Sequence, residues 1–195
     1  MIRRSHQKRG RLRTAFLRDR SGVAAVEFAL ISPTIILILV GLVDLGGMLY
    51  TRFQLDASLT AGANYAMING TSVNATSAAA LASTLAGLVS SGQSSNWANS
   101  SVTVNAGPTA SSSGGVVTTG GTASSADSCY CPSGATTGSI TWGSSQTCGA
   151  TCTGGGFAGK FVLLSATHAY TPIFSGYGMV APNGQITTTS LVQVQ

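Results

Sequence analysis

A glycine and an acid stand together where the chain changes from basic to apolar. Gly22 ends a basic leader, Val23 begins an apolar run, and Glu27 followed by Phe28 comes within the run's first two turns. A carboxylate within a bilayer costs about 2.5–3.5 kcal/mol at a helix centre and less at its end, so a positive partner is expected. A helix N-terminus offers a partial positive charge. A free amine on Val23, made by cleavage after Gly22, would offer a full one.

Four cysteines in two short groups are the second chemical feature. Cys129 and Cys131 form the first group, and Cys148 and Cys152 form the second. Outside the cytoplasm cysteines usually pair, and a bridge within Cys-x-Cys would be strained, so we expect two bridges between the groups with the pairing left open. Zinc held by four thiolates is the alternative, although these spacings differ from the common Cys-x2-Cys knuckles. The residues expected at the apolar centre of this loop are Pro132, Trp142 and Phe157.

No catalytic constellation is found in the sequence. His6 lies in the leader, and His168 falls in a strand pattern, where a structural place on a sheet face is expected. No G-x-S-x-G motif surrounds a serine, and Gly154-Gly155-Gly156 precedes Phe157 rather than a Lys-Ser pair. We therefore expect no enzyme activity, cofactor or metal site. An envelope hydrolase that uses a serine and His168 is the alternative, which nothing in the sequence favours.

The positive charge of the chain is concentrated at its N-terminus. The 195 residues include ten basic and five acidic side chains, a formal net charge of +5. Eight of the ten basic residues fall within the first 20 positions. A nucleic-acid-binding body would need a distributed basic patch, so nucleic acid is not expected as a partner. A charge share of 8% also argues against an ordinary cytosolic enzyme.

A stretch able to cross a membrane follows the leader. Residues 28–43 carry no charge, and residues 23–50 are mostly apolar, with Glu27, Pro33 and Asp44 as interruptions. A bilayer needs about 20 residues, so Glu27 and Asp44 are expected near the two interfaces. The basic flank predicts a cytoplasmic N-terminus. A cleaved secretory signal is the alternative, but Asp44 stands where its small-residue cleavage site should begin.

Residues 21–66 carry a set of markers that occur together in one family. The markers are Gly22, Glu27-Phe28, Ala29, Pro33, Asp44-Leu45-Gly46, Tyr50 and the small residues of 57–66. With this set the segment resembles the TadE-like family of tight-adherence pilus assembly proteins. Gly47 is a departure, because many relatives carry an arginine in this region.

The resemblance implies a bacterial minor pseudopilin, since the family's main pilin is very short and this chain has a large outer part. A prepilin peptidase would cut between Gly22 and Val23 on the cytoplasmic face. Glu27 would then be the fifth residue of the mature chain, where it could pair with the Val23 amine of a neighbour, and Phe28 would stand where relatives carry Phe or Tyr. Pro33 would either aid helix packing or leave a harmless kink.

The same resemblance implies the partners and the location of the chain. The partners are the prepilin peptidase, other pilins or pseudopilins, the inner-membrane pilus assembly machinery and the lipid bilayer. The chain would cross the bacterial inner membrane once, with a cytoplasmic N-terminus and a periplasmic C-terminal domain, and could enter an extracellular pilus. A signal-anchored envelope binding module or adhesin is the alternative, with its leader uncleaved and the cysteine loop as its active surface.

The expected fold is α+β. A long helix over 23–68 continues past the membrane and ends at Asn69-Gly70, and a second, amphipathic helix packs on a small antiparallel sheet. Strands are expected at 101–104, 160–170 and 186–195, the last two joined by a turn at Ala181-Pro182-Asn183-Gly184. The apolar residues of the second helix are Ala78, Leu81, Ala82, Leu85, Leu88 and Val89.

Three segments follow from these expectations. Residues 1–22 form a basic leader that is cleaved, residues 23–68 form the membrane and extended helix, and residues 69–195 form the outer α+β domain. Within that domain the Ser-, Thr- and Gly-rich residues 105–159 are expected to be a flexible loop, because they can bury little apolar surface.

Overall fold

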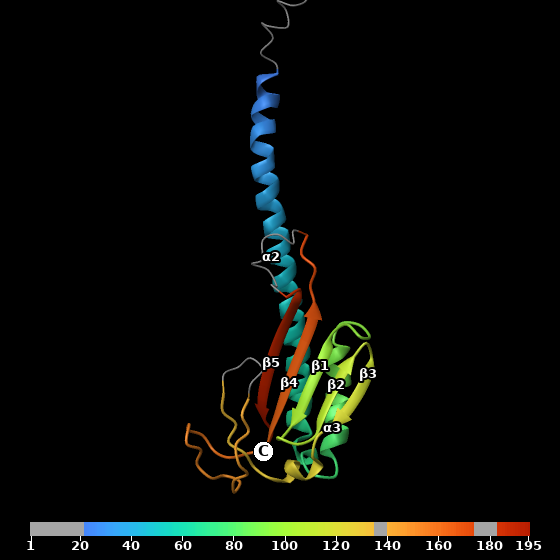
Figure 1. The fold of residues 1–195 in the computed structure, drawn as a ribbon, viewed down its shortest axis with the longest axis vertical. Helices are drawn as coiled ribbons and strands as arrows, with labels where there is room; N and C mark the ends of the chain where they lie inside the picture. The colour runs from blue at the N-terminus through green and yellow to red at the C-terminus, as the bar shows by residue number, and fades with distance from the viewer. Residues whose placement is uncertain (1–21, 135–139, 174–182) are drawn as a thin grey trace, which may run out of the picture. The chain divides into compact units, whose positions relative to one another are not determined.

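The computed structural model describes residues 22–134, 140–173 and 183–195 (Figure 1). The predicted leader before Gly22 and the Ala181-Pro182 half of the predicted turn lie outside the described residues. The chain divides into two compact units, Met1–Val43 and Asp44–Gln195, each described by itself below. The elements in chain order are α2 (Val23–Ile68), η1 (Gly70–Ser72), α3 (Ala78–Ser90), β1 (Asn99–Val104), β2 (Thr109–Ser113), β3 (Val116–Gly120), η2 (Ala123–Asp127), β4 (Phe161–Ala169) and β5 (Gln185–Gln193).

The described part of the first unit is the beginning of α2. Among the described residues, α2 is the one helix long and apolar enough to span a membrane, with a mean hydropathy of 2.4 over its most apolar window. Its aliphatic side chains point outward on all sides, as Leu30, Ile36 and Leu42 illustrate by being more than half exposed. A helix that is apolar all round fits a single-pass membrane anchor.

The second unit is built on a five-stranded antiparallel sheet. The strand order is β3-β2-β1-β4-β5, and Val102 of β1 pairs with Leu164 of β4 near the middle of the sheet. β4 buries Val162, Leu164 and Ala166 on one face, as its alternating pattern predicts. The α+β fold class and the three predicted strands are confirmed.

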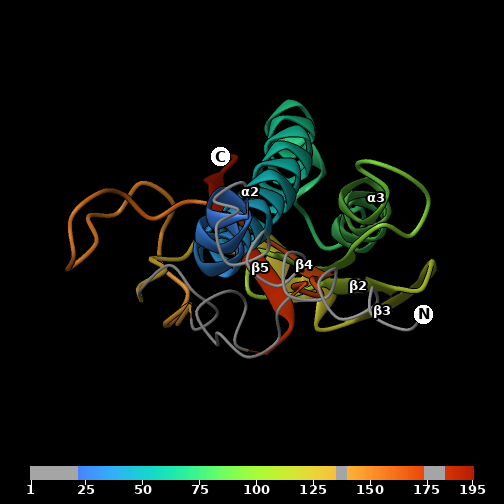
Figure 2. The same cartoon turned by 90° about the horizontal axis from the view of Figure 1, so that it is seen from above.

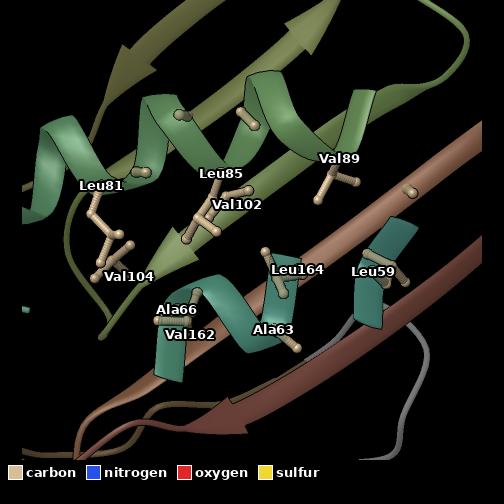
Figure 3. Close-up of a cluster of buried hydrophobic side chains, with 14 of the residues drawn as sticks. Leu59, Ala63, Ala66, Leu81, Leu85, Val89, Val102, Val104, Val162 and Leu164 are labelled. Carbon is tan, nitrogen blue, oxygen red and sulfur yellow. The ribbon is translucent and has the colours of Figure 1, made fainter. Parts of the chain in front are cut away.

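The second half of α2 and the whole of α3 cover the same face of this sheet (Figure 2). Gly62 lets the two helices approach closely, because a Cβ placed there would lie 2.8 Å from a methyl carbon of Val89. Figure 3 shows the cluster between the helices and the strands. The labelled core residues are Leu59, Ala63, Ala66, Leu81, Leu85, Val89, Val102, Val104, Val162 and Leu164. The predicted helix-on-sheet packing is therefore confirmed.

Two expectations about the second unit are wrong. Leu88 is predicted on the buried face of α3, but its side chain is 40% exposed. The segment 105–159 is not one continuous loop, because β2, β3 and η2 lie within it. β2 and β3 form a hairpin through Gly114 and Gly115, both with positive φ. Their strands consist of Ser, Thr, Val, Ala and Gly, so backbone pairing beside β1 holds them with little apolar burial.

Leu85 and Leu88 provide a matched test of this core. Leu85 is fully buried under the sheet, so Leu85→Ala is expected to lower the free energy of unfolding by about 2–5 kcal/mol. Leu88→Ala, one turn further along the same helix, should change it by no more than about 0.5 kcal/mol. Denaturant unfolding of the full chain in detergent micelles measures both changes. Equal effects of the two substitutions would contradict the packing of α3.

Candidate functional site

The predicted processing segment occupies the first two turns of α2. The helix begins at Val23, and the carbonyl of Gly22 accepts a hydrogen bond from the Val26 N–H at 3.1 Å. Gly22 therefore stands at the N-cap position, and the Gly22–Val23 peptide bond lies at the helix end. Glu27 and Phe28 follow with exposed side chains. The carboxylate thus lies close to the positive end of the helix dipole.

The fold of the described residues gives no reason for a glycine at position 22. A Cβ built on Gly22 would have no atom within 4 Å, and its φ is not in the left-handed region. Other glycines do have such reasons: a Cβ on Gly121 would lie 2.1 Å from the Gly107 carbonyl oxygen, and Gly121 has a φ of +84°.

Pro33 lies inside α2 with an exposed side chain. Proline has no N–H, so the carbonyl of Ala29, four residues earlier, lacks its usual helical donor. The Ser32 hydroxyl donates a long hydrogen bond of 3.5 Å to that same carbonyl. Serine side chains commonly satisfy backbone groups freed by proline in membrane helices. The helix α2 continues through Pro33 to Ile68.

A second site lies at the start of the folded unit, around Asp44. This residue is buried, with 6% of its surface exposed. The Asp44 Oδ1 atom accepts a hydrogen bond from the Ile173 N–H at 2.8 Å, and its backbone carbonyl accepts one from the Tyr170 hydroxyl at 2.7 Å. Burial raises the pKa of Tyr170, and the Asp44 charge raises it further, so the phenol stays protonated and remains a donor. The sequence placed Asp44 near an interface but gave no sign of these partners.

Gly47 gives the Tyr170 ring its place beside α2. A Cβ at position 47 would lie 2.7 Å from the Tyr170 hydroxyl oxygen and 3.5 Å from the nearest ring carbon. Any side chain at position 47 would therefore have to displace the Tyr170 hydroxyl, which donates to the Asp44 carbonyl.

The cysteine segment is closed by two bridges between the predicted groups. Cys129 pairs with Cys148 and Cys131 with Cys152, with Cα–Cα separations of 5.1 and 5.7 Å. The preference for disulfides between the groups is confirmed, and the pairing, which the spacing leaves open, is now defined. Because each sulfur is bonded to another, the alternative of a zinc site with four thiolates is wrong.

An open cleft of about 580 Å³ lies beside these bridges. Its lining includes Trp142, whose ring meets Tyr130 edge-on at 6.2 Å, and Gln146. Phe157 also lines it but is 66% exposed, so its expected place in a buried apolar centre is wrong. The lining residues carry no charge, so the cleft could accept a neutral group.

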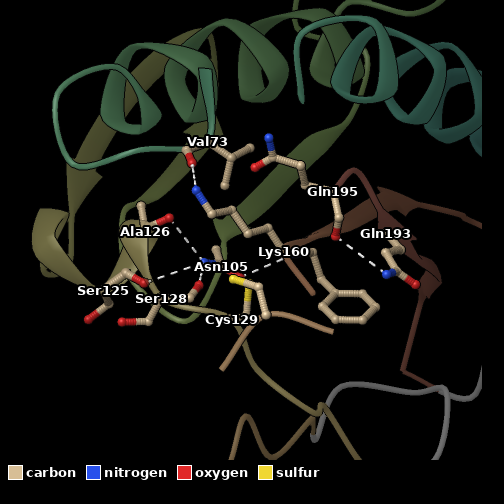
Figure 4. Close-up of a disulfide and its surroundings, with 11 residues drawn as sticks. Val73, Asn105, Ser125, Ala126, Ser128, Cys129, Lys160, Gln193 and Gln195 are labelled. Carbon is tan, nitrogen blue, oxygen red and sulfur yellow. Dashed lines mark hydrogen bonds between the residues drawn. A yellow bond between two sulfur atoms is a disulfide. The ribbon is translucent and has the colours of Figure 1, made fainter. Parts of the chain in front are cut away.

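Asn105, which the sequence analysis missed, joins the cysteine segment to the sheet (Figure 4). Its buried amide donates to the carbonyls of Ala126 and Ser128 at 3.1 and 2.5 Å, and its Oδ1 accepts from the Phe161 N–H at 3.3 Å. Its φ of +51° is unusual, although asparagine adopts it more readily than most residues. The only available signal was an asparagine directly after the predicted strand 101–104.

His168, which the sequence analysis considered for catalysis, and Asp127, the acid before the cysteine segment, each have a separate structural contact. The His168 ring stacks on Trp97 at 4.5 Å, and its Nδ1 lies 2.6 Å from the Trp97 carbonyl oxygen. Asp127 accepts a hydrogen bond from the Ala75 N–H at 2.9 Å. Within the described ranges, no group of three or more His, Cys, Asp or Glu residues could hold a metal ion. His168 thus has the structural position that was expected of it.

Comparison with known proteins gives a family match over the segment that contains the first of these sites. Residues 22–64 match the family model described as TadE-like protein. The match begins at Gly22 and ends within α2, so it contains the predicted processing segment and Asp44 but none of the sheet. No curated protein and no solved structure gives a significant match. The resemblance is confirmed for this segment, and it connects the chain with tight-adherence pili in general terms.

Gly46 and Gly47 provide a matched test of the contact at Asp44. A Cβ at Gly46 meets open space, so Gly46→Ala should raise the free energy of unfolding by up to about 1 kcal/mol through helix propensity. Gly47→Ala displaces the Tyr170 hydroxyl, and the lost hydrogen bond should remove about 1 kcal/mol of that gain.

Tyr170→Phe supplies the control for this pair. It removes the oxygen that the new Cβ would contact, so the two alanine substitutions should have equal effects in that background. Thermal unfolding followed by circular dichroism measures all the variants. A persistent difference between positions 46 and 47 without the hydroxyl would contradict the role assigned to Tyr170.

Proposed function

We propose that this chain, whose residues 22–64 form a TadE-like segment, is a minor pseudopilin-like structural protein of tight-adherence pilus biogenesis. A prepilin peptidase removes the leader after Gly22, and the mature chain assembles through its N-terminal helix. The observation that carries the proposal is the position of Gly22 between a basic leader and an apolar helix, with Glu27 about one turn inside that helix. Gly22 stands at the end of an apolar helix, and the described fold requires no glycine there.

The position of Glu27 supports the same proposal. After cleavage the Val23 amine would carry a full positive charge at the helix end, and Glu27 would lie one helical turn along. The carboxylate side chain is exposed, so it is accessible to the amine of a neighbouring subunit. An ion pair between subunits would offset the cost of holding a carboxylate at membrane depth. Pro33, with its ring also exposed, is the second residue proposed to act in helix packing.

The remaining parts of the proposal concern location, partners and chemistry. The helix anchors the chain in the bacterial inner membrane, with the leader in the cytoplasm and the sheet domain in the periplasm, or in a pilus after assembly. Other pilins or pseudopilins and the inner-membrane assembly machinery are the proposed partners. Disulfides form and persist in oxidising compartments such as the periplasm, which agrees with a periplasmic sheet domain. We propose no enzymatic activity, because His168 and Asp127 both have structural contacts.

A second candidate function is an anchored adhesin or binding module that keeps its leader. The uncharged cleft beside the two disulfides favours it, because Phe157 remains 66% exposed at that cleft. In this case the mature protein would begin at its first residue and would not depend on the peptidase. The N-terminus of the membrane-bound protein therefore distinguishes the two functions.

Processing is tested by replacing Gly22. The mature N-terminus, read by mass spectrometry of the membrane protein, should be Val23 and should require the prepilin peptidase. Gly22→Ala should abolish this cut while the unfolding temperature stays unchanged, because a Cβ at position 22 meets nothing. Gly41→Ala, also with open space around it, is the control and should leave cleavage intact. Cleavage that continues in Gly22→Ala, or without the peptidase, would refute the processing.

Assembly is tested separately at Glu27. Glu27→Ala and Glu27→Gln both remove the charge, so both should reduce copurification with other pilins several-fold even where the leader is cleaved. Glu27→Asp keeps a carboxylate and should retain part of the assembly. Affinity purification from crosslinked membranes measures the association. If Glu27→Ala matured and assembled as well as the parent chain, the proposed ion pair would be wrong.

A further inference from the structure

The first turns of the folded unit expose a group of large apolar side chains. We call it the collar and define it as Leu45, Leu49, Tyr50, Phe53 and Ile173. The first four lie on α2 and Ile173 follows β4, and their exposed fractions are 45, 40, 65, 68 and 64%. The four helical members lie opposite the buried side of α2, to which Asp44 and Leu55 belong, whereas Ile173 lies beside Asp44. A folded domain rarely leaves such a group in water without a use.

The length of the apolar helix locates this collar near the bilayer. The uncharged residues 28–43 span about 24 Å at about 1.5 Å per residue, whereas the hydrocarbon core is about 30 Å thick. Twenty residues counted from Phe28 end at Gly47. Asp44 then falls within the hydrocarbon thickness, and Tyr50 and Phe53 fall in the headgroup region beyond it.

The structure removes the main objection to this placement, which is the charge on Asp44. Its side chain is turned into the folded unit, where Oδ1 accepts the Ile173 N–H at 2.8 Å. A carboxylate shielded by protein and hydrogen-bonded does not meet lipid directly. The sequence predicts a membrane interface at Asp44 because a charged side chain is expected to face water. In the structure this side chain is buried in the folded unit instead.

We propose that the collar is a lipid-contacting surface, which sets the folded unit into the leaflet on the C-terminal side of the span. The apolar members contact acyl chains or the lower headgroup region, and Tyr50 lies at the level where tyrosine is enriched in membrane proteins. Arg52 is exposed on the same part of the helix, and its guanidinium reaches lipid phosphates while its stem lies along the apolar surface.

Two backbone donors near Asp44, at Tyr170 and Ile173, are satisfied within the protein. The Tyr170 N–H donates to the Gly184 carbonyl at 2.9 Å, Pro172 has no N–H, and the Ile173 N–H donates to Asp44. Irregular backbone is tolerated at membrane depth when its polar groups are satisfied within the protein. The collar also continues the membrane stretch along one unbroken helix, Val23–Ile68, which favours lipid over a soluble partner.

The test places single fluorescent labels along α2 of the full chain in vesicles of phosphatidylcholine with some phosphatidylglycerol. All four native cysteines are paired, so Leu49→Cys and Phe53→Cys each supply one reactive thiol. Asn64→Cys is the matched control, because Asn64 is exposed on the same side of the helix about three turns beyond Phe53. Ile38→Cys reports on the membrane span itself.

Labels at 49 and 53 should be quenched by nitroxide lipids and be several-fold less sensitive to aqueous iodide than the label at 64. If the labels at positions 53 and 64 were equally sensitive to iodide while the label at position 38 was protected, the lipid contact of the collar would be wrong and the membrane span would still hold. Protection at 53 that disappears when the protein is diluted in lipid would assign the surface to a second copy and also overturn the proposal. Iodide access at 38 would overturn the span itself. The proposal rests on the span but not on cleavage after Gly22.

Discussion

Leu164 of β4 packs against Gly62 of α2 and pairs with Val102 of β1, and the rest of the folded unit is arranged around this contact. A Cβ at Gly62 would lie 3.6 Å from a methyl carbon of Leu164, so the backbone of α2 packs directly on the Leu164 side chain. The same glycine admits Val89 of α3. Both helices are thereby held on one face of the sheet, and this fixes the side of α2 that is left exposed near Tyr50 and Phe53.

Four of the five charged residues of the folded unit join elements, and the fifth, Arg52, is exposed. Asp44 accepts the Ile173 N–H, Asp56 accepts the Thr188 hydroxyl of β5, and Asp127 accepts the Ala75 N–H before α3. Lys160 donates to the Val73 carbonyl at 2.7 Å. Hydrogen bonds to charged groups are stronger than neutral ones. A domain rich in serine, threonine and glycine thus gains fixed contacts where its apolar core is thin.

The elements that can be predicted from the sequence are those with a clear hydrophobic pattern. The period of Leu81, Leu85 and Val89 indicated α3, and the alternation of β4 indicated its buried face. The hairpin of β2 and β3 was missed because its pairing depends on the backbone, which leaves no hydrophobic alternation in a Ser- and Thr-rich segment. Asn105 was missed for a related reason, since its partners are distant carbonyls. Two disulfides between the cysteine groups followed from spacing, but their pairing did not.

Some glycines are required by packing in the folded unit, and others are not. Gly47 and Gly62 are explained by side chains that would collide with a Cβ, whereas Gly22 has open space around it. Open space alone is weak evidence, because Gly87 in the folded unit also has none of these contacts. Gly22 differs in its place between a basic leader and an apolar helix, with Glu27 one turn inside. The TadE-like match begins at this residue, in agreement with the processing proposed above.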